Sequence, residues 1–391
     1  MAERCDVLIV GGALWGCATA YHLLSRDPGV RVTIVERDAT FEHAASALST
    51  AGVRILFSQE ESIRMSQYGH EFYGNFAELM GLEENPLPLA FHRNGYLFTA
   101  GSAEQSADME ENFRIQSSLG CDVRLLDSAA VKRQWPSMVA DDIACAAWSP
   151  GDGWIDPWGA LTGLFRKVKA LGATYRQAEV TGIERDGNKI SAVRLADGGR
   201  IEADIFLNAA GAWGPVLCEM VGMKVPVAPL PRQQFYFETD VTLEPFPLVR
   251  DHFGAGFRPE GKGYLAGIGD PERIGQFSWD VHHEWFEERL WPGIASRVPA
   301  FERLKVKSSW ACHYSQNTFD GNMILGPWIG GAENFLVAIG DSGHGLQHAP
   351  AGGRALAELI LKGRYETLDL TRLSYRRIID NVPYPERGMR L

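Results

Sequence analysis

Three glycines and one acid near the start of the chain have the residue types and spacing of a phosphate-binding turn. Gly11 and Gly12 end a short apolar run, Gly16 follows shortly after, and Glu36 ends the next apolar run. In this pattern a glycine permits a tight turn, the amides of the following helix hold a pyrophosphate, and the acid accepts hydrogen bonds from a ribose diol. Ala13 stands where the pattern has its second glycine, so the match is incomplete. The spacing still predicts a dinucleotide site.

The elements that must position these residues can be read from the same stretch. Apolar runs and helical spacing predict a strand over 6–10, a helix over 13–25 and a second strand over 30–35. Strand, glycine turn, helix, strand and terminal acid make one mononucleotide-binding half of an α/β fold. The alternative is an α/β unit whose glycines serve only packing. Other segments must decide between the two.

A second glycine-rich turn lies near the C-terminus. Residues 340–345 (GDSGHG) follow an apolar strand over 335–339 and precede a helix expected from about 350 to 362. Such a turn gathers backbone N–H groups toward an anion or a carbonyl. Residues 202–213 are expected to form a strand that delivers the small residues Ala210 and Gly211 close to a ligand. Upstream of it, residues 180–197 predict a hairpin.

Five segments in order resemble the D-amino-acid oxidase superfamily of FAD-dependent oxidoreductases, nearest its sarcosine-oxidase-like and FAD-dependent oxidoreductase-domain branches. They are LIVGGALWG at 8–16, TAGVR at 50–54, NAAGAW at 208–213, WACHYSQNTFDGNMILGP at 310–327 and GDSGHGLQHAP at 340–350. The resemblance runs the whole length of the chain and implies FAD as the cofactor. It disfavours NAD alone, because the turn at 340–345 has no role in a nicotinamide-only domain.

The resemblance implies an α/β protein with two domains. A Rossmann-like FAD-binding domain would be discontinuous and take residues 1–82, 150–223 and 322–391. An α+β substrate domain built on an antiparallel sheet would take residues 83–149 and 224–321. Alternating and glycine-punctuated stretches at 229–238 and 253–268 agree with short strands in the second domain.

The resemblance also assigns roles to individual residues. The expected cofactor-binding residues are Gly11, Gly12, Ala13, Leu14, Trp15, Gly16, Glu36, Arg37, Arg54, Val180, Ala210, Gly211, Trp213, Cys312, Gly343, His344, Gly345, Leu346 and Gln347. The candidate catalytic residues are Arg54, Trp310, Tyr314 and His344. Arg54 would face the flavin edge or a substrate carboxylate, and the backbone N–H of His344 would face the flavin pyrimidine. Each has a structural alternative: a surface arginine, a core histidine or aromatic packing.

Cys312 carries the most specific expectation. In the sarcosine-oxidase-like enzymes a cysteine, followed by a tyrosine and then an aspartate, bonds to the 8α carbon of the flavin. Cys312, Tyr314 and Asp320 repeat that order, with one extra residue before the aspartate. A thiolate would be the nucleophile. The alternative is a small buried cysteine that only lines a noncovalently bound FAD.

Two absences distinguish the chain from sarcosine oxidases. Leu265 stands where those enzymes carry a lysine that assists the reaction of reduced flavin with oxygen, so slow reoxidation is expected. Gln347 stands where they carry a lysine that holds the substrate carboxylate. Sarcosine itself is therefore expected to be a poor substrate. Arginines that could anchor an anion instead, or be plain surface charges, are Arg93, Arg232, Arg250 and Arg258.

Composition and charge exclude several classes of protein. A net charge of −11 disfavours nucleic acid as a partner. No window approaches the length of apolar sequence that spans a membrane, and the first residues run into a strand with no expected signal peptide. The six cysteines show neither CxxC pairs nor metal-ligand spacing, which favours free thiols and a cytoplasmic location.

The function expected from the resemblance is oxidation of the C–N bond of an amino acid or an N-alkylated amine. The hydride would pass to flavin N5, and oxygen or another carrier would then accept the electrons. One alternative is a flavin-dependent dehydrogenase of 2-hydroxy acids. Another belongs to a different class, a non-catalytic FAD-holding assembly factor, because fold alone does not settle function.

Overall fold

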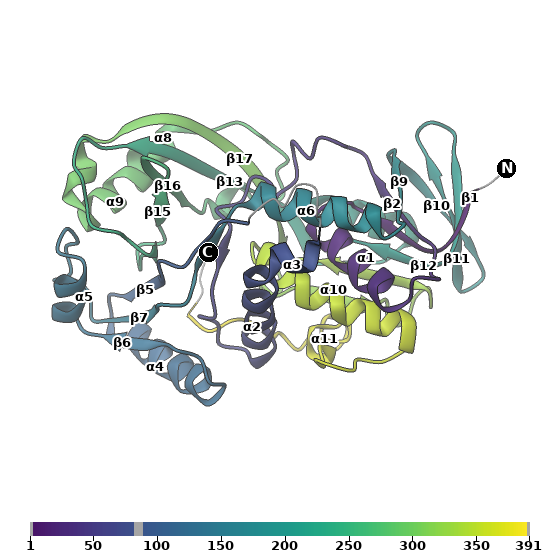
Figure 1. Ribbon diagram of the computed structural model, residues 1–391, viewed down its shortest axis with the longest axis horizontal. Helices are drawn as coiled ribbons and strands as arrows, with labels where there is room; N and C mark the ends of the chain where they lie inside the picture. Colours follow the sequence, from purple (N-terminus) through teal and green to yellow (C-terminus); the bar gives the residue numbers. More distant parts are fainter. Residues whose placement is uncertain (1–2, 82–88, 389–391) are drawn as a thin grey trace.

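The computed structural model describes residues 3–81 and 89–388. Its strands form two large sheets and one small sheet, and Figure 1 shows the two large sheets at opposite ends of the molecule. The predicted boundary at 82/83 lies outside the described residues. The other predicted domain boundaries stay predictions.

The first large sheet is built around parallel strands. In order, its strands are β10 (Val180–Asp186), β11 (Lys189–Leu195), β12 (Arg200–Asn208), β1 (Glu3–Val10), β2 (Val32–Glu36) and β9 (Thr174–Gln177), with β19 (Phe335–Ile339) beside β12 and β18 (Ile324–Pro327) beside β19. The strands β12, β1, β2 and β9 pair in parallel, as does β19 with β12. The predicted N-terminal strand–turn–helix–strand unit and the predicted hairpin β10–β11 are confirmed.

The second large sheet is mixed. In order, its strands are β17 (Lys305–Asn317), β13 (Val227–Glu238), β16 (Gly263–Ile268), β15 (Gly256–Glu260), β14 (Leu248–Arg250), β5 (Tyr96–Ala100), β7 (Cys145–Ser149) and β6 (Arg124–Leu126). All neighbours are antiparallel except β14 and β5, which are parallel. The sheet is therefore predominantly antiparallel, as expected, and the one parallel pair joins β14 and β5, which come from distant parts of the chain. A small sheet of β3 (Gly52–Val53), β8 (Gly153–Ile155) and β4 (Phe91–His92) also forms.

Helices cover the first sheet and flank the second. Their bounds are α1 (Leu14–Arg26), α2 (Glu60–Gly74), α3 (Phe76–Met80), α4 (Ala103–Ser118), α5 (Ser128–Gln134), α6 (Pro157–Ala170), α7 (Gly214–Val221), α8 (His283–Trp285), α9 (Trp291–Arg297), α10 (Gly345–Lys362) and α11 (Arg376–Ile379). Within the two described ranges, no helix combines the length and apolarity that a membrane crossing requires.

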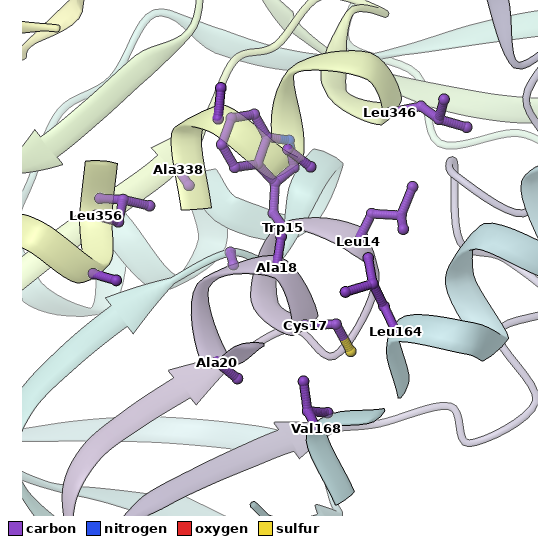
Figure 2. Close-up of a cluster of buried hydrophobic side chains, with 14 of the residues drawn as sticks. Leu14, Trp15, Cys17, Ala18, Ala20, Leu164, Val168, Ala338, Leu346 and Leu356 are labelled. Atoms are coloured by element: carbon purple, nitrogen blue, oxygen red, sulfur yellow. The ribbon is translucent and has the colours of Figure 1, made fainter. Parts of the chain in front are cut away.

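Helix α1 is the centre of the core beside the first sheet. Figure 2 shows Trp15 directed toward α10, with Cys17 facing Leu164 and Val168 of α6. A Cβ at Gly353 of α10 would lie 2.7 Å from a backbone carbon of Ala18, so this glycine lets the two helices touch. This packing fixes the position of both helix N-termini, which frame the site described below.

Helix α10 begins earlier than the sequence indicated. The expected start was near residue 350, but the helix begins at Gly345 and Pro350 lies inside it. Proline cannot donate to the carbonyl of Leu346, and the hydroxyl of Tyr73 donates to that oxygen at 2.6 Å instead. A side chain from α2 therefore makes the hydrogen bond that proline cannot, and the helix continues.

Candidate functional site

The turn between β1 and α1 needs glycine at Gly11. Its φ of 106° lies in the left-handed region, and a Cβ there would lie 2.3 Å from the carbonyl oxygen of Ala209. A Cβ at Gly16 would lie 1.9 Å from the carbonyl oxygen of Gly11. Ala13 has an ordinary φ of −78°, which explains why alanine is accepted where the pattern has glycine.

This turn opens onto a cavity of about 200 Å³. Of the expected cofactor-binding residues, those that line it are Gly11, Ala13, Leu14, Trp15, Glu36, Arg37, Val180, Ala210, Gly211, Trp213, Gly343, Gly345 and Leu346. Segments that are far apart in sequence therefore meet at one surface. Gly12 of the turn and Gly16 in the first turn of α1 are absent from the lining, and a Cβ at either would contact packed protein atoms.

Glu36 stands at the edge of this cavity with its carboxylate held in place. Its two oxygens accept from the N–H of Gly12 at 2.8 Å and from the N–H of Asp38 at 3.0 Å. A carboxylate oxygen has more than one lone pair, so both retain capacity for a hydroxyl donor such as a ribose. Nearby, the Arg37 guanidinium lies 3.9 Å from the Trp213 ring centroid, which makes a flat cationic wall.

The turn 340–345 is tied to strand β17. The N–H of Gly340 donates to the hydroxyl of Ser315 at 2.9 Å, and the N–H of Ser342 donates to the carbonyl of Ser315 at 2.9 Å. The N–H of His344 donates to the carbonyl of Asp341 at 2.8 Å. The turn thus uses this N–H internally, which disfavours the expectation that it faces a flavin. The first amides of α10, which follow it, lack intrahelical acceptors.

A larger cavity of about 530 Å³ adjoins the first one. Ser49, Tyr314, Gly343 and Leu346 line both cavities, so the two spaces share a wall. A Cβ at Gly343 would lie 2.3 Å from the Tyr314 ring, which shows how closely the ring lies on the glycine turn. The larger cavity also takes in Arg54, His344 and Gln347, three expected cofactor-binding residues that do not line the smaller one.

Arg54 is held in an aromatic enclosure. Its guanidinium carbon lies 4.3 Å from the Phe57 ring centroid, 5.5 Å from that of Tyr96 and 5.4 Å from that of Phe98. The Gln347 side-chain oxygen accepts from the backbone N–H of Arg54 at 2.9 Å. Gln347 therefore positions the segment that carries Arg54. The surface-arginine alternative is excluded, since Arg54 is 9% exposed.

His344 lines the larger cavity as a neutral side chain. Burial and then the charge of Arg54 hold the pKa of His344 well below its ordinary value. The ring lies edge-on to Phe57, with 5.0 Å between centroids. His344 therefore contributes an uncharged polar ring to the cavity at neutral pH.

Besides Gly12 and Gly16, three sequence candidates line neither cavity. Trp310 donates from its indole to the carbonyl of Leu48 at 3.1 Å and lines neither cavity, so the structure does not place it where a catalytic residue would be. Arg93 donates to the carbonyl of Gly151 at 3.1 Å at the surface. Cys312 is 1% exposed and lines neither cavity, and burial raises its pKa to about 12.

Several residues of the larger cavity could not be predicted from sequence motifs. Tyr96, Phe98 and Gln234 line it, and none belongs to a motif. They come from β5 and β13, which are distant in the chain and meet only through the pairing of the second sheet. Alternation along these strands would have shown which side chains share a face of the sheet, but not which face lines the larger cavity.

The residues present fit an FAD molecule. In the described chain, neither α1 nor α10 has a side-chain cap at its N-terminus, and neither has an acid in its first turn. Their first amides are thus left for an anion or a carbonyl. Glu36 supplies acceptors to the smaller cavity, and Gly343 and Gly345 of the turn 340–345 also line it.

A dinucleotide cavity on a parallel sheet, next to a second cavity on a mixed sheet, defines a dinucleotide-dependent oxidoreductase architecture. The chain belongs to the FAD-dependent oxidoreductase (DAO) family, whose family model matches residues 6–359. The resemblance stated from the five sequence motifs is thereby confirmed.

Individual relatives agree with this assignment. FAD-dependent oxidoreductase domain-containing protein 1 of Xenopus laevis is 36% identical over 99% of this chain and 85% of its own length. Mitochondrial sarcosine dehydrogenase of Homo sapiens is 27% identical over 94% of this chain and 40% of its own length. The crystal structure of L-proline dehydrogenase from P. horikoshii superimposes with a TM-score of 0.88 at 26% identity, covering 98% of this chain and 100% of the other.

Proposed function

We propose that this protein oxidises the C–N bond of an amino acid or an N-alkylated amine with FAD. The names of two relatives support this substrate class, since one is a sarcosine dehydrogenase and the other an L-proline dehydrogenase. The observation that carries the proposal is the larger cavity, which shares a wall with the dinucleotide cavity and is lined by Arg54, Arg232 and Arg250. Guanidinium groups in such a place suit a substrate carboxylate.

The residues of the cavity account for binding and protonation. When bound, FAD supplies the oxidant that takes a hydride from the carbon next to the substrate nitrogen, and water then hydrolyses the resulting imine to a carbonyl compound and an amine. The arginines favour a carboxylate and disfavour an ammonium group, so they lower the pKa of a bound amine toward its neutral, oxidisable form. His344 is uncharged at neutral pH, so it does not add to the positive charge of the arginines.

An anaerobic substrate screen tests this function. Amino acids, N-methyl amines and 2-hydroxy acids are mixed with the yellow holoprotein without oxygen, and loss of the oxidised-flavin absorbance is followed. We expect bleaching by at least one amine and release of the corresponding carbonyl product. Bleaching by hydroxy acids alone would replace the proposal with a 2-hydroxy-acid dehydrogenase. Bleaching by none of these compounds would favour an assembly factor.

We expect FAD to be bound noncovalently, without a bond to Cys312. The thiol lines neither cavity, and burial raises its pKa to about 12, although the charge of Arg232 acts in the opposite direction. Both observations disfavour a thiolate that reaches the flavin. We therefore expect acid precipitation to release all FAD into the supernatant from wild-type protein and from Cys312→Ser alike. Yellow pellets from wild type, with a flavin adduct on the Cys312 peptide by mass spectrometry, would show covalent attachment instead.

The reaction with oxygen needs a different expectation from the one drawn from Leu265 alone. Leu265 lines the larger cavity, but so do Arg232 and Arg250. A cation beside the flavin assists oxygen reduction, and these arginines provide cations without the missing lysine. The basis for expecting slow reoxidation is thus removed, and oxygen and another carrier both stay proposals as the acceptor. A cytoplasmic location also stays a proposal, supported by the six free thiols.

A further inference from the structure

The floor of the larger cavity is one row of paired residues across the second sheet. On this row Gln234 pairs with Gly267, and Gly267 pairs with Gly256. Arg250 completes the row by pairing with Gly256. All four residues line the cavity, and the two central glycines leave it open between the outer side chains.

The outer two side chains lie over these glycines. A Cβ at Gly267 would lie 2.8 Å from the side-chain oxygen of Gln234. A Cβ at Gly256 would lie 3.9 Å from Nη1 of Arg250. Because neighbouring strands are only about 4.8 Å apart, the amide of Gln234 and the guanidinium of Arg250 face the same small space. The floor therefore presents the guanidinium of Arg250, a donor, and the amide of Gln234, which can donate or accept, to whatever occupies the cavity.

Arg232 is a buried cation without a protein partner for part of its guanidinium. It is 6% exposed, lines the cavity, and lies 5.0 Å from the Tyr314 ring centroid. Its Nε and Nη1 have no hydrogen-bond partner among the described residues. A buried charged group normally has a partner, so these atoms point to an anion that comes from outside the chain.

Arg250 lies close enough to Arg232 and Arg54 for their positive charges to act on it. Burial and then the charge of Arg232 lower its pKa to about 10, which leaves it charged at neutral pH. Arg54 also acts on it in the same direction. No carboxylate is among the groups that most affect Arg250; the others are the phenols of Tyr96 and Tyr314.

Three other charged residues of this cavity, Asp251, Asp320 and Arg258, are already engaged. Asp251 accepts from Arg297 at 2.6 Å, and Asp320 accepts from Arg377 at 2.7 Å. Arg258 donates to the carbonyl of Thr50 at 2.9 Å and pairs with Glu260. None of these pairs uses Arg232 or Arg250.

We propose that this cavity selects an amine substrate that carries two carboxylates, such as a dicarboxylic amino acid or an N-carboxyalkyl amino acid. The proposal rests on the proposed function and specifies its substrate class. One carboxylate lies beside Arg54, and the second lies between Arg232 and Arg250. A monocarboxylic amine that places its carboxylate beside Arg54 leaves the buried positive charge of Arg232 and Arg250 without a counter-charge from the ligand.

Ligand binding to the holoprotein tests this selection without turnover. Glutarate is compared with pentanoate, which has the same chain length and one carboxylate. Dissociation constants come from perturbation of the flavin absorbance, and melting temperatures report stabilisation. We expect glutarate to bind at least about tenfold more tightly, the effect of roughly one additional charge-assisted pair. Arg232→Gln and Arg250→Gln should each reduce the preference to below about threefold, because each removes one cation from the second subsite.

A matched control is Arg303→Gln, which removes an arginine whose side chain is 70% exposed at the surface and should leave the preference unchanged. If Arg250→Gln proves unstable, Arg250→Lys is used in its place. It keeps the charge and should therefore retain part of the preference for glutarate. Equal binding of glutarate and pentanoate by wild-type holoprotein would overturn the inference, as would an unchanged preference in both glutamine variants. A glutarate preference with no amine able to bleach the flavin would support the dianion subsite and overturn the proposed oxidation.

Discussion

Gly11→Val is expected to give a colourless protein, with FAD content below about a tenth of wild type. The φ of 106° at this position is strained for any residue with a Cβ and most strained for a branched one. The added Cβ would lie 2.3 Å from the carbonyl oxygen of Ala209, so the turn must move away from β12. That movement displaces the start of α1, whose first amides face the dinucleotide cavity. FAD is measured by the absorbance of the purified protein and by chromatography of the released cofactor.

Two further variants separate loss of FAD from loss of the fold. Gly151→Ala is the control, because a Cβ there meets no atom within 4 Å and should leave FAD content unchanged. Ala13→Leu fills the same cavity from a residue with an ordinary φ of −78°, so it should remove FAD while circular dichroism stays as in wild type. Full FAD content in both Gly11→Val and Ala13→Leu would show that the pyrophosphate turn has been assigned wrongly.

Asp320→Asn is expected to lower the free energy of unfolding by about 3 kcal/mol, the usual effect of breaking a buried ion pair. The Asp320 side chain has no exposure, and it accepts from Nε of Arg377 at 2.7 Å and from Nη2 at 3.1 Å. The backbone N–H of Tyr384 donates to it at 3.0 Å. The substitution leaves the buried Arg377 without a counter-charge and loosens the C-terminal segment at the cavity edge. Urea titration of the FAD-loaded protein gives the change.

The matched control is Asp240→Asn. Asp240 pairs with Arg303 at 3.6 Å, but both side chains are more than half exposed, at 62% and 70%. Such a pair contributes at most about 1 kcal/mol, so this variant should unfold close to wild type. An effect of Asp320→Asn no larger than that of the control would contradict the structural role given to Asp320. The aspartate of the family motif would then need another explanation.

The sequence determined the dinucleotide half of the protein because the signals for it are local. Gly11, Gly16 and Glu36 act within one strand–turn–helix–strand unit, so their spacing alone shows where the turn, the helix and the second strand fall. The hairpin β10–β11 and the strand β19 were predictable for the same reason. The start of α10 was not, since the hydrogen bond that allows Pro350 inside the helix comes from Tyr73 on another helix.

Only the tertiary structure decided which arginines share a cavity. Arg93, Arg232, Arg250 and Arg258 were equivalent in the sequence, but one lies at the surface and one is paired to Glu260. Arg232 and Arg250 line the same cavity because their strands, β13 and β14, belong to one sheet. The two strands between them, β16 and β15, carry glycines that leave the space open. Strand order depends on pairing between distant segments, and no short-range pattern records it. The kind of cofactor could therefore be predicted from the local spacing of motif residues. The charge of the substrate cavity could not, because it depends on the pairing of strands that are distant in sequence.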